Sequence, residues 1–363
     1  MPDVILEGSY LEGGGQILRN ALALSALTGK SFSVSDIRKG RCNPGLKAQH
    51  LFCVKAAAQL CGADFTDVEI GSETVAFFPK KLKAQNLDID IGTAGSMSLF
   101  LQAVLLPAMF ANAPLKISVA GGTDVIWSMP VDYLKNVFLP HLQKYARAEI
   151  RILKRGFYPK GGGKIEIEIR PKFKSNDFEN FEEFAGYLKQ KDRIFLEEQG
   201  KLLQIKGVSH ASKNLWDAKV AERQAMSAES ALKKLKCPVQ IASEYSDTYS
   251  PGSAVTLWAV FSKGEEIDSL NPIILGADAL GERGKSSENV GKEAAEKLLK
   301  EIESGAPVDH HLADNLIPFL GLFGGKIKVS RITSHALTNI YVTEKFLDVK
   351  FKVDKEKNLV EVK

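Results

Sequence analysis

One histidine, His335, lies in a polar setting in which its side chain could do covalent chemistry. It belongs to the run Thr333-Ser334-His335-Ala336-Leu337-Thr338-Asn339, ahead of residues 340–342, which read as a buried strand. At the mouth of a strand, one ring nitrogen can be held by a neighbour while the other points outward. A neutral imidazole nitrogen can attack phosphorus and form a covalent intermediate. A single histidine is more often a surface or hydrogen-bonded structural residue, so the residues alone leave both interpretations open.

A glycine-rich turn, Glu12-Gly13-Gly14-Gly15-Gln16, opens a predicted helix near the N-terminus. Backbone N–H groups at a helix start can hold phosphate, although this turn lacks the ending of a Walker loop and the spacing of a dinucleotide fingerprint. Glu12 could bind a divalent cation beside a triphosphate, or it could only complement the helix dipole. Asp314, in the first turn of a predicted helix, has the same two interpretations. Two adjacent histidines, His310 and His311, would face different sides of that helix, which argues against a metal pair.

The elements that must position these residues form an internal repeat. Apolar spacing of three and four predicts helices, and alternation predicts strands. The first unit has a helix at 16–27, a strand at 32–37, a helix at 45–61, and strands at 65–70 and 74–78. The second has a strand at 87–91, helices at 96–110 and 131–145, and strands at 115–120, 148–153 and 164–169. Each order matches a β-α-β-α-β-β unit.

A third copy is predicted at the C-terminal end, with helices at 287–302 and 311–322 and strands at 326–332, 337–342 and 347–353. Residues between about 175 and 275 break the pattern and predict a small inserted α/β domain. We therefore expect an α/β (α+β) fold of three repeated units sharing one core. The predicted boundaries are 1–180 for the first two repeats, 181–275 for the insert and 276–363 for the third repeat.

Composition indicates a globular protein without a disulfide scaffold. The chain has 363 residues, a net charge of +4, and four cysteines that form no Cys-x-x-Cys pair, which favours a reducing, cytoplasmic compartment. The longest apolar run, at 99–111, is interrupted by Gln102 and Pro107 and is too short to span a bilayer. Neither a membrane association nor an obligatory protein partner is predicted. The weak positive charge does not by itself identify a partner.

Several long motifs, in order from residue 5 to residue 350, resemble the RNA 3′-terminal phosphate cyclase family. The first are Leu11-Glu12-Gly13-Gly14-Gly15-Gln16-Ile17-Leu18-Arg19 and Pro44-Gly45-Leu46-Lys47-Ala48-Gln49-His50-Leu51. The others are Gly121-Gly122-Thr123-Asp124, Gly156-Phe157-Tyr158-Pro159-Lys160-Gly161-Gly162-Gly163, Leu312-Ala313-Asp314, and Ser334-His335 with Leu337-Thr338-Asn339. The resemblance is weakest across the predicted insert.

The resemblance implies three repeats with a small insert, ATP as co-substrate, Mg²⁺ or Mn²⁺, and an RNA with a 3′-terminal phosphate as substrate. It implies that His335 attacks the α-phosphate of ATP and passes AMP to the RNA 3′-phosphate. The neighbouring 2′-hydroxyl then closes a 2′,3′-cyclic phosphate.

Further roles follow from the resemblance, position by position. Glu12 matches the family's metal-binding carboxylate. The residues that match the family's contacts to phosphate and to the RNA end are Arg19, Arg38, Arg41, Gln49 and His50. The residues that match its nucleotide pocket are Gln102, Pro251, Gly252, His311, Asp314 and Asn315. His311 and Asn315 depart from the Tyr and Gln that other members carry, which affects the expected adenine and ribose contacts.

Two alternatives compete with this interpretation. A non-catalytic branch of the same family assists ribosomal RNA processing but lacks the nucleophilic histidine, whereas His335 is present here. An enolpyruvyl-transferase-like enzyme also stacks such repeats, but that activity gives His335 no role.

Overall fold

The first repeat forms a four-stranded sheet backed by two helices. In the computed structural model, which describes residues 1–264 and 266–362, it comprises β1 (Val4–Glu7), α1 (Gln16–Thr28), β2 (Phe32–Ser35), α2 (Ala48–Cys61), β3 (Asp64–Phe65) and β4 (Val75–Phe78). The sheet order is β1-β2-β4-β3, with β1 parallel to β2 and the other pairs antiparallel. Alternate residues of β1, β2 and β4 are buried, so one face of the sheet covers the helices.

The second repeat has the same order of strands. It comprises β5 (Leu87–Asp90), α3 (Met97–Ala108), β6 (Leu115–Gly121), a helical stretch of α4 (Val131–Tyr133), η1 (Leu134–Phe138) and α5 (Leu139–Leu142), then β7 (Ala146–Lys154) and β8 (Gly163–Pro171). Its sheet runs β5-β6-β8-β7, again with only the first pair parallel.

The third repeat completes the pattern and confirms the predicted fold class. It comprises β9 (Ile194–Leu196), α9 (His310–Phe323), β14 (Gly325–Lys328), α10 (Ser334–Phe346), β15 (Phe351–Asp354) and β16 (Leu359–Val362). Its sheet order, β9-β14-β16-β15, equals that of the other two. The strand predicted at 337–342 is wrong, because this segment lies within α10. Ala336, Asn339, Ile340 and Thr343 are buried at helical spacing, and the Thr333 side chain caps the helix start.

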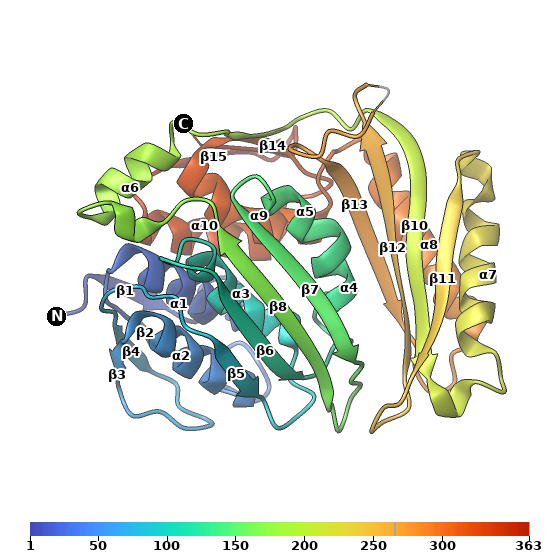
Figure 1. Ribbon diagram of the computed structural model, residues 1–363, viewed down its shortest axis with the longest axis horizontal. Helices are drawn as coiled ribbons and strands as arrows, with labels where there is room; N and C mark the ends of the chain where they lie inside the picture. Colours follow the sequence, from blue (N-terminus) through green and yellow to red (C-terminus); the bar gives the residue numbers. More distant parts are fainter. Residues whose placement is uncertain (265, 363) are drawn as a thin grey trace.

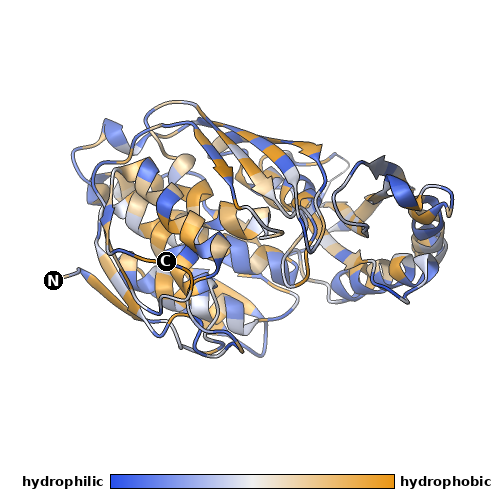
Figure 2. Ribbon diagram, turned by 90° about the horizontal axis from the view of Figure 1, so that it is seen from below, coloured by the Kyte–Doolittle hydropathy of each residue, from blue (hydrophilic) through white to orange (hydrophobic). Residues whose placement is uncertain are grey.

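A fourth sheet forms the small unit. This unit comprises β10 (Lys201–Ser212), α7 (Val220–Leu232), β11 (Val239–Ser246), β12 (Ser253–Ser262), β13 (Ile273–Leu280) and α8 (Ser287–Glu303). The strands of its sheet lie in the order β11-β10-β12-β13. Helices α7 and α8 pack against each other beside this sheet (Figure 1). Figure 2 shows the unit projecting from one side of the larger body.

The insert therefore differs from the predicted range of 181–275. Its sheet begins at β10, and α8, which was assigned to the third repeat, packs on β12 and β13 instead. In the other direction, β9 belongs to the third sheet, and α6 (Phe181–Leu188) contacts α9. Apolar spacing identified α8 as a helix correctly, but spacing does not reveal which sheet a helix covers.

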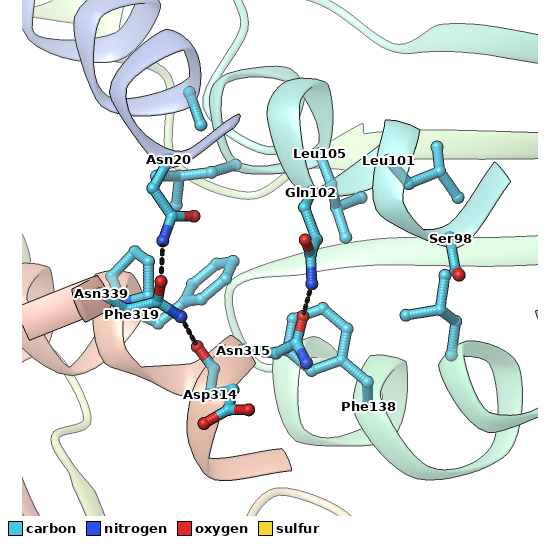
Figure 3. A pocket seen from close by; sticks show the side chains of 14 residues that line it. Asn20, Ser98, Leu101, Gln102, Leu105, Phe138, Asp314, Asn315, Phe319 and Asn339 are labelled. Carbon is cyan, nitrogen blue, oxygen red and sulfur yellow. Dashed lines mark hydrogen bonds between the residues drawn. The ribbon is translucent and has the colours of Figure 1, made fainter. Parts of the chain in front are cut away.

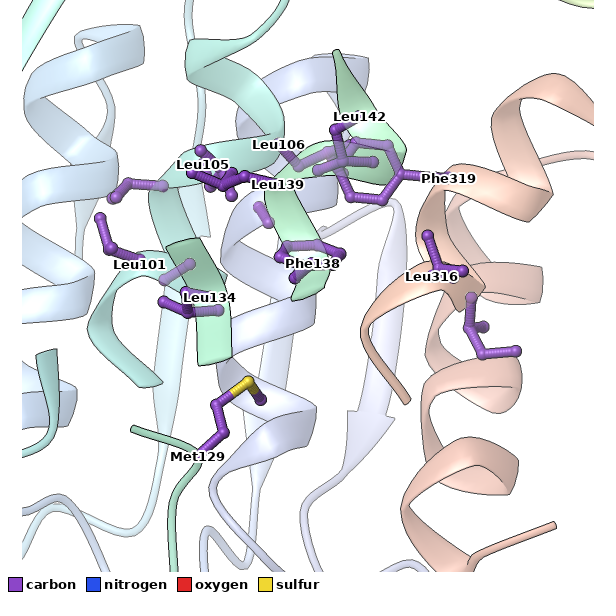
Figure 4. Close-up of a cluster of buried hydrophobic side chains, with 14 of the residues drawn as sticks. Leu101, Leu105, Leu106, Met129, Leu134, Phe138, Leu139, Leu142, Leu316 and Phe319 are labelled. Carbon is purple, nitrogen blue, oxygen red and sulfur yellow. The ribbon is translucent and has the colours of Figure 1, made fainter. Parts of the chain in front are cut away.

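The core lies between the three sheets of the larger body, where the first helices of the repeats meet. All thirteen residues of α1 are buried, and α1 contacts α2, α3 and α10. Leucines of α3 meet Leu134 and Phe138 of η1 and Phe319 of α9, so side chains from two repeats share one apolar cluster (Figure 4). None of the helices in the described chain is long and apolar enough to cross a lipid bilayer.

Candidate active site

A cleft of about 970 Å³ opens over the N-terminal ends of α1, α2 and α10. It gathers eleven of the thirteen residues predicted from the sequence, from all three repeats: Glu12, Arg19, Arg38, Arg41, Gln49, His50, Gln102, His311, Asp314, Asn315 and His335. Pro251 and Gly252 do not line it. Gly252 instead packs against the ring of Phe157, where a Cβ would collide with that ring.

His335 is the second residue of α10 and points at Glu12. Its Nε2 lies 3.2 Å from Glu12 Oε2, and Glu12 in turn lies 3.6 Å from Arg41 Nη2. Partial burial, together with Arg19, Arg41 and His310, lowers the pKa of His335 below its usual 6.5, although Glu12 opposes this shift. The imidazole is therefore uncharged near neutral pH, which is the form in which a ring nitrogen can act as a nucleophile.

A network of hydrogen bonds fixes the turn that carries His335. Thr333 Oγ1 accepts a hydrogen bond from the Ala336 amide at 2.8 Å and donates to Asp314 Oδ1 at 2.6 Å. Asn339, one turn further along α10, donates to the Asp314 carbonyl at 2.6 Å. Asp314 therefore orients the start of α10 through both its side chain and its backbone.

Below the cleft, amide side chains connect the three repeats. Figure 3 shows Asn20 of α1 donating to Asn339, and Gln102 of α3 donating to Asn315 of α9; these bonds measure 2.6 and 2.9 Å. Arg19 Nε donates to Gln102 Oε1 at 2.9 Å. Because the amides of Gln102, Asn315 and Asn339 each accept one hydrogen bond and donate another, the floor of the cleft has one defined arrangement.

Gly15, Arg19 and His50 form a cradle that would hold an anion. A Cβ at Gly15 would collide with His50 Nε2 and with the Arg19 guanidinium. The Lys47 amide donates to His50 Nδ1 at 3.1 Å, so the proton lies on Nε2, which has no partner within residues 1–264 and 266–362. Burial, together with Arg19, Arg38 and Lys47, lowers the pKa of His50 well below 6.5. The cradle thus offers a neutral N–H donor and a buried guanidinium.

Arg38 reaches the cleft from a constrained turn. Its backbone has φ +58°, and its Nη1 donates to the carbonyls of Asn43 and Gly45 at 2.7 and 2.9 Å. Burial and the nearby Arg41 lower the pKa of Arg38 from 12.5. Crowding of the guanidinium groups indicates that this wall is built to receive negative charge.

Other cleft residues escaped the sequence analysis. Asp278 of β13 and Lys297 of α8 line the cleft from the small unit. No sequence signal pointed to them, because both segments were predicted to belong to the third repeat and not to the small unit. Trp127 also lines the cleft. It was missed because the Gly121-Gly122-Thr123-Asp124 motif ends three residues before it.

Replacing Asp314 with asparagine is expected to stabilise the protein at alkaline pH. Burial raises the pKa of Asp314 from 3.8 to about 7, against the opposing effect of the Thr333 hydrogen bond. The folded state must therefore hold an unfavourable charge above pH 7, at a cost on the order of 4 kcal/mol that disappears as the pH falls toward 4. Asp314→Asn keeps an acceptor for Thr333. Urea unfolding at pH 8.5 should show a gain that is absent at pH 4. The exposed Asp348→Asn serves as the control, and an equal gain at both pH values would contradict the prediction.

Comparison with known proteins finds similar chains that share one description. A family model described as RNA 3′-terminal phosphate cyclase matches residues 10–353. A protein of Pyrococcus abyssi with that name is 46% identical over 355 residues, covering 97% of this chain and 96% of its own. The proteins of the same name from Pyrococcus furiosus and Methanococcoides burtonii are each 44% identical, over 354 and 359 residues, and cover 96% and 98% of this chain and 95% and 98% of their own.

Proposed function

The chain belongs to the RNA 3′-terminal phosphate cyclase family, and we propose that it uses ATP to convert an RNA 3′-terminal phosphate into a 2′,3′-cyclic phosphodiester through an adenylylated His335. The observation that carries this proposal is the position of the His335 imidazole, whose Nε2 lies 3.2 Å from Glu12 Oε2 in a cleft lined by Arg19, Arg38 and Arg41. Cyclase activity, with RNA and ATP as substrates, follows from the family. The histidine intermediate and the residue roles are those that the resemblance implies, and the proposal is supported by the cleft that brings these residues together.

The reaction consists of three displacements at phosphorus. A ring nitrogen of His335 attacks the α-phosphate of ATP, the P–N bond forms and pyrophosphate leaves. An oxygen of the RNA 3′-phosphate then attacks the same phosphorus, which frees the imidazole and joins AMP to the RNA end. Finally the 2′-hydroxyl attacks the activated 3′-phosphate, losing its proton, and AMP leaves. Because this hydroxyl is tethered beside the phosphorus, closure has the entropic advantage of an intramolecular reaction.

The cradle of Gly15, Arg19 and His50 suits the RNA 3′-phosphate. It contributes a buried guanidinium and an N–H group that needs an acceptor, and both strengthen as charge builds up on phosphate oxygens in the transition state. Arg38 and Arg41 would extend this contact to neighbouring phosphates. Gln102, His311 and Asn315 line the side assigned to the nucleotide, and Asp314 acts by holding the turn of His335.

Glu12 is suited to hold Mg²⁺ or Mn²⁺. Such ions commonly use one or two carboxylates and complete their coordination with phosphate oxygens and water, and Glu12 Oε2 faces both His335 and the cleft. The bound ion would neutralise charge on the triphosphate. The same Glu12 carboxylate oxygen lies 3.2 Å from His335 Nε2.

A direct test uses three short RNAs that differ only at the 3′ end: a 3′-phosphate, a 3′-hydroxyl, and a 2′-deoxy 3′-phosphate. With ATP and Mg²⁺ or Mn²⁺, only the first should be converted to a cyclic phosphate, with one AMP and one pyrophosphate released per end. The 2′-deoxy end should stop at the adenylylated stage, because it lacks the closing hydroxyl. Cyclisation without release of pyrophosphate would overturn the proposed mechanism.

A further inference from the structure

Trp127 is an exposed aromatic side chain on the rim of the cleft. Its side chain is 87% exposed although it lines the same cleft as His335 and Glu12. Its backbone has φ +67°, a left-handed conformation that is strained for a bulky residue and that is often kept at functional sites. Exposure of this ring to water and strain in its backbone both cost free energy. These costs favour a functional role in which a ligand covers the indole.

The loop that presents Trp127 is held at several points. The Thr123 amide donates to the Gly156 carbonyl at 2.9 Å, and the Val131 amide donates to the Thr123 carbonyl at 3.1 Å, which closes the loop. Within it, Ser98 of α3 donates to the Met129 carbonyl at 2.6 Å. The indole is therefore presented from a fixed backbone, so that little entropy is lost when a ligand stacks on it.

A buried ionic cluster joins the two ends of this loop. Asp124 begins the loop and Asp132 follows it; Arg155 Nη1 donates to Asp132 Oδ2 and lies 3.8 Å from Asp124 Oδ2. His210, from β10 of the small unit, has its Nε2 3.2 Å from Asp124 Oδ1. Asp124, Asp132 and His210 are close enough to share a metal ion, but the Arg155 guanidinium already supplies the positive charge. We assign this cluster to shaping the loop.

We propose that Trp127 is a stacking platform for a nucleobase of the RNA strand, within the last few nucleotides before the 3′ end. ATP can lie entirely inside the cleft, whereas an RNA strand must continue out through its mouth. Met129, two residues inward, is buried and contacts Asn315 on the nucleotide side, with Asn315 Nδ2 3.7 Å from the Met129 sulfur. Trp127, two residues earlier in the chain, lines the same cleft but is exposed. Every base has a face that can stack on an aromatic ring, so the platform fits RNA of any sequence.

This inference rests on the proposed function, because it concerns how the same cleft holds its RNA. Arg38, Arg41 and Lys47 line the same cleft and provide positive charge for the backbone phosphates. A basic wall combined with an aromatic platform is the usual way in which proteins bind single-stranded nucleic acid without reading its sequence.

The test compares Trp127→Ala and Trp127→Phe with Trp216→Ala, which removes an exposed tryptophan of the small unit outside the cleft. Loss of a stacked base costs about 1–3 kcal/mol, or about 5- to 150-fold in affinity. Trp127→Ala should raise the KM for a 3′-phosphate RNA by this factor, Trp127→Phe should restore most of it, and Trp216→Ala should match the wild type. A series of RNAs would each carry one abasic nucleotide, placed one position further from the 3′ end in each member. At one position the abasic nucleotide should weaken binding to the wild type, but it should not weaken binding to Trp127→Ala.

Each outcome bears on a distinct claim. If the wild type cyclises RNA and Trp127→Ala does so with an unchanged KM, the platform is refuted while the proposed function stands. If the KM for ATP in protein adenylylation rises and that for RNA does not, the platform serves the adenine of ATP, and the assignment to RNA is wrong. If the wild type fails to cyclise any RNA, the proposed function itself is refuted.

Discussion

Replacing His335 with alanine is expected to abolish transfer of the label from α-phosphate-labelled ATP to the protein. The variant loses the only atom assigned to attack phosphorus, so cyclisation should fall by at least about a thousandfold, as in other enzymes that lose their nucleophile. On a denaturing gel, label on the wild type should be lost in acid and retained in base, as expected of a phosphoramidate. Addition of a 3′-phosphate RNA should discharge it.

His310→Ala is a suitable control for this experiment. His310 belongs to the same repeat, and its Nδ1 pairs with Glu301 Oε1 at 2.7 Å outside the cleft. Its replacement should leave the protein able to accept label. Because burial and nearby cations lower the pKa of His335, labelling of the wild type should persist below pH 6.5 and fall only in more acidic solution. Label that remains on His335→Ala would assign the nucleophile to another residue.

Replacing Arg155 with leucine is expected to lower the free energy of unfolding by about 3–5 kcal/mol. The change leaves two carboxylates, on Asp124 and Asp132, buried without their cation. Burial opposes ionisation of Asp124, but His210 and Arg155 together lower its pKa to about 2. The stabilisation that reflects this lowered pKa is present above pH 4 and is lost as the pH falls toward 2. Urea unfolding at pH 7 measures the effect.

Arg151→Leu offers a matched comparison, because Arg151 lies in β7, which ends just before Arg155. Arg151 is exposed and lies 3.4 Å from Glu168 Oε1, and such surface pairs contribute at most about 1 kcal/mol. The variant Arg155→Leu with Asp132→Asn should recover part of the loss, because one buried charge is removed. A loss at Arg155→Leu no greater than that at Arg151→Leu would show that the cluster does not stabilise the fold.

The repeat was predictable because its signals are local. Apolar spacing and glycine turns lie within each unit of about 80 residues, and the three sheets confirm the predicted order. Two predictions were wrong: the strand at 337–342 and the assignment of α8 to the third repeat. The segment 340–342 contains β-branched and aromatic residues typical of a strand, but its buried positions continue the helical spacing from Ala336 to Phe346. The sheet to which α8 attaches depends on tertiary packing, which spacing does not encode.

The sequence predicted the site residues that lie within or beside the motifs shared with the family. Eleven residues chosen from motif resemblance line one cleft, although they come from segments up to about 320 positions apart. Asp278 and Lys297 were missed because they reach the cleft from the small unit, across a boundary that the sequence placed elsewhere. His335 was chosen correctly as a cleft residue for a partly incorrect reason: it lies at the start of a helix and not at the mouth of a strand.

The position of the insert has a consequence for synthesis of the chain. The first strand of the third sheet, β9, pairs with β14, so that Ile194 lies opposite Gly325, about 130 residues later. The first two sheets can form as soon as their own residues leave the ribosome, whereas β9 must wait, unpaired, until the insert and α9 have been made. His335 follows shortly after β14, and the last strand ends at Val362. A prematurely terminated chain could therefore fold the sheets of the first two repeats while lacking His335, the proposed acceptor of AMP.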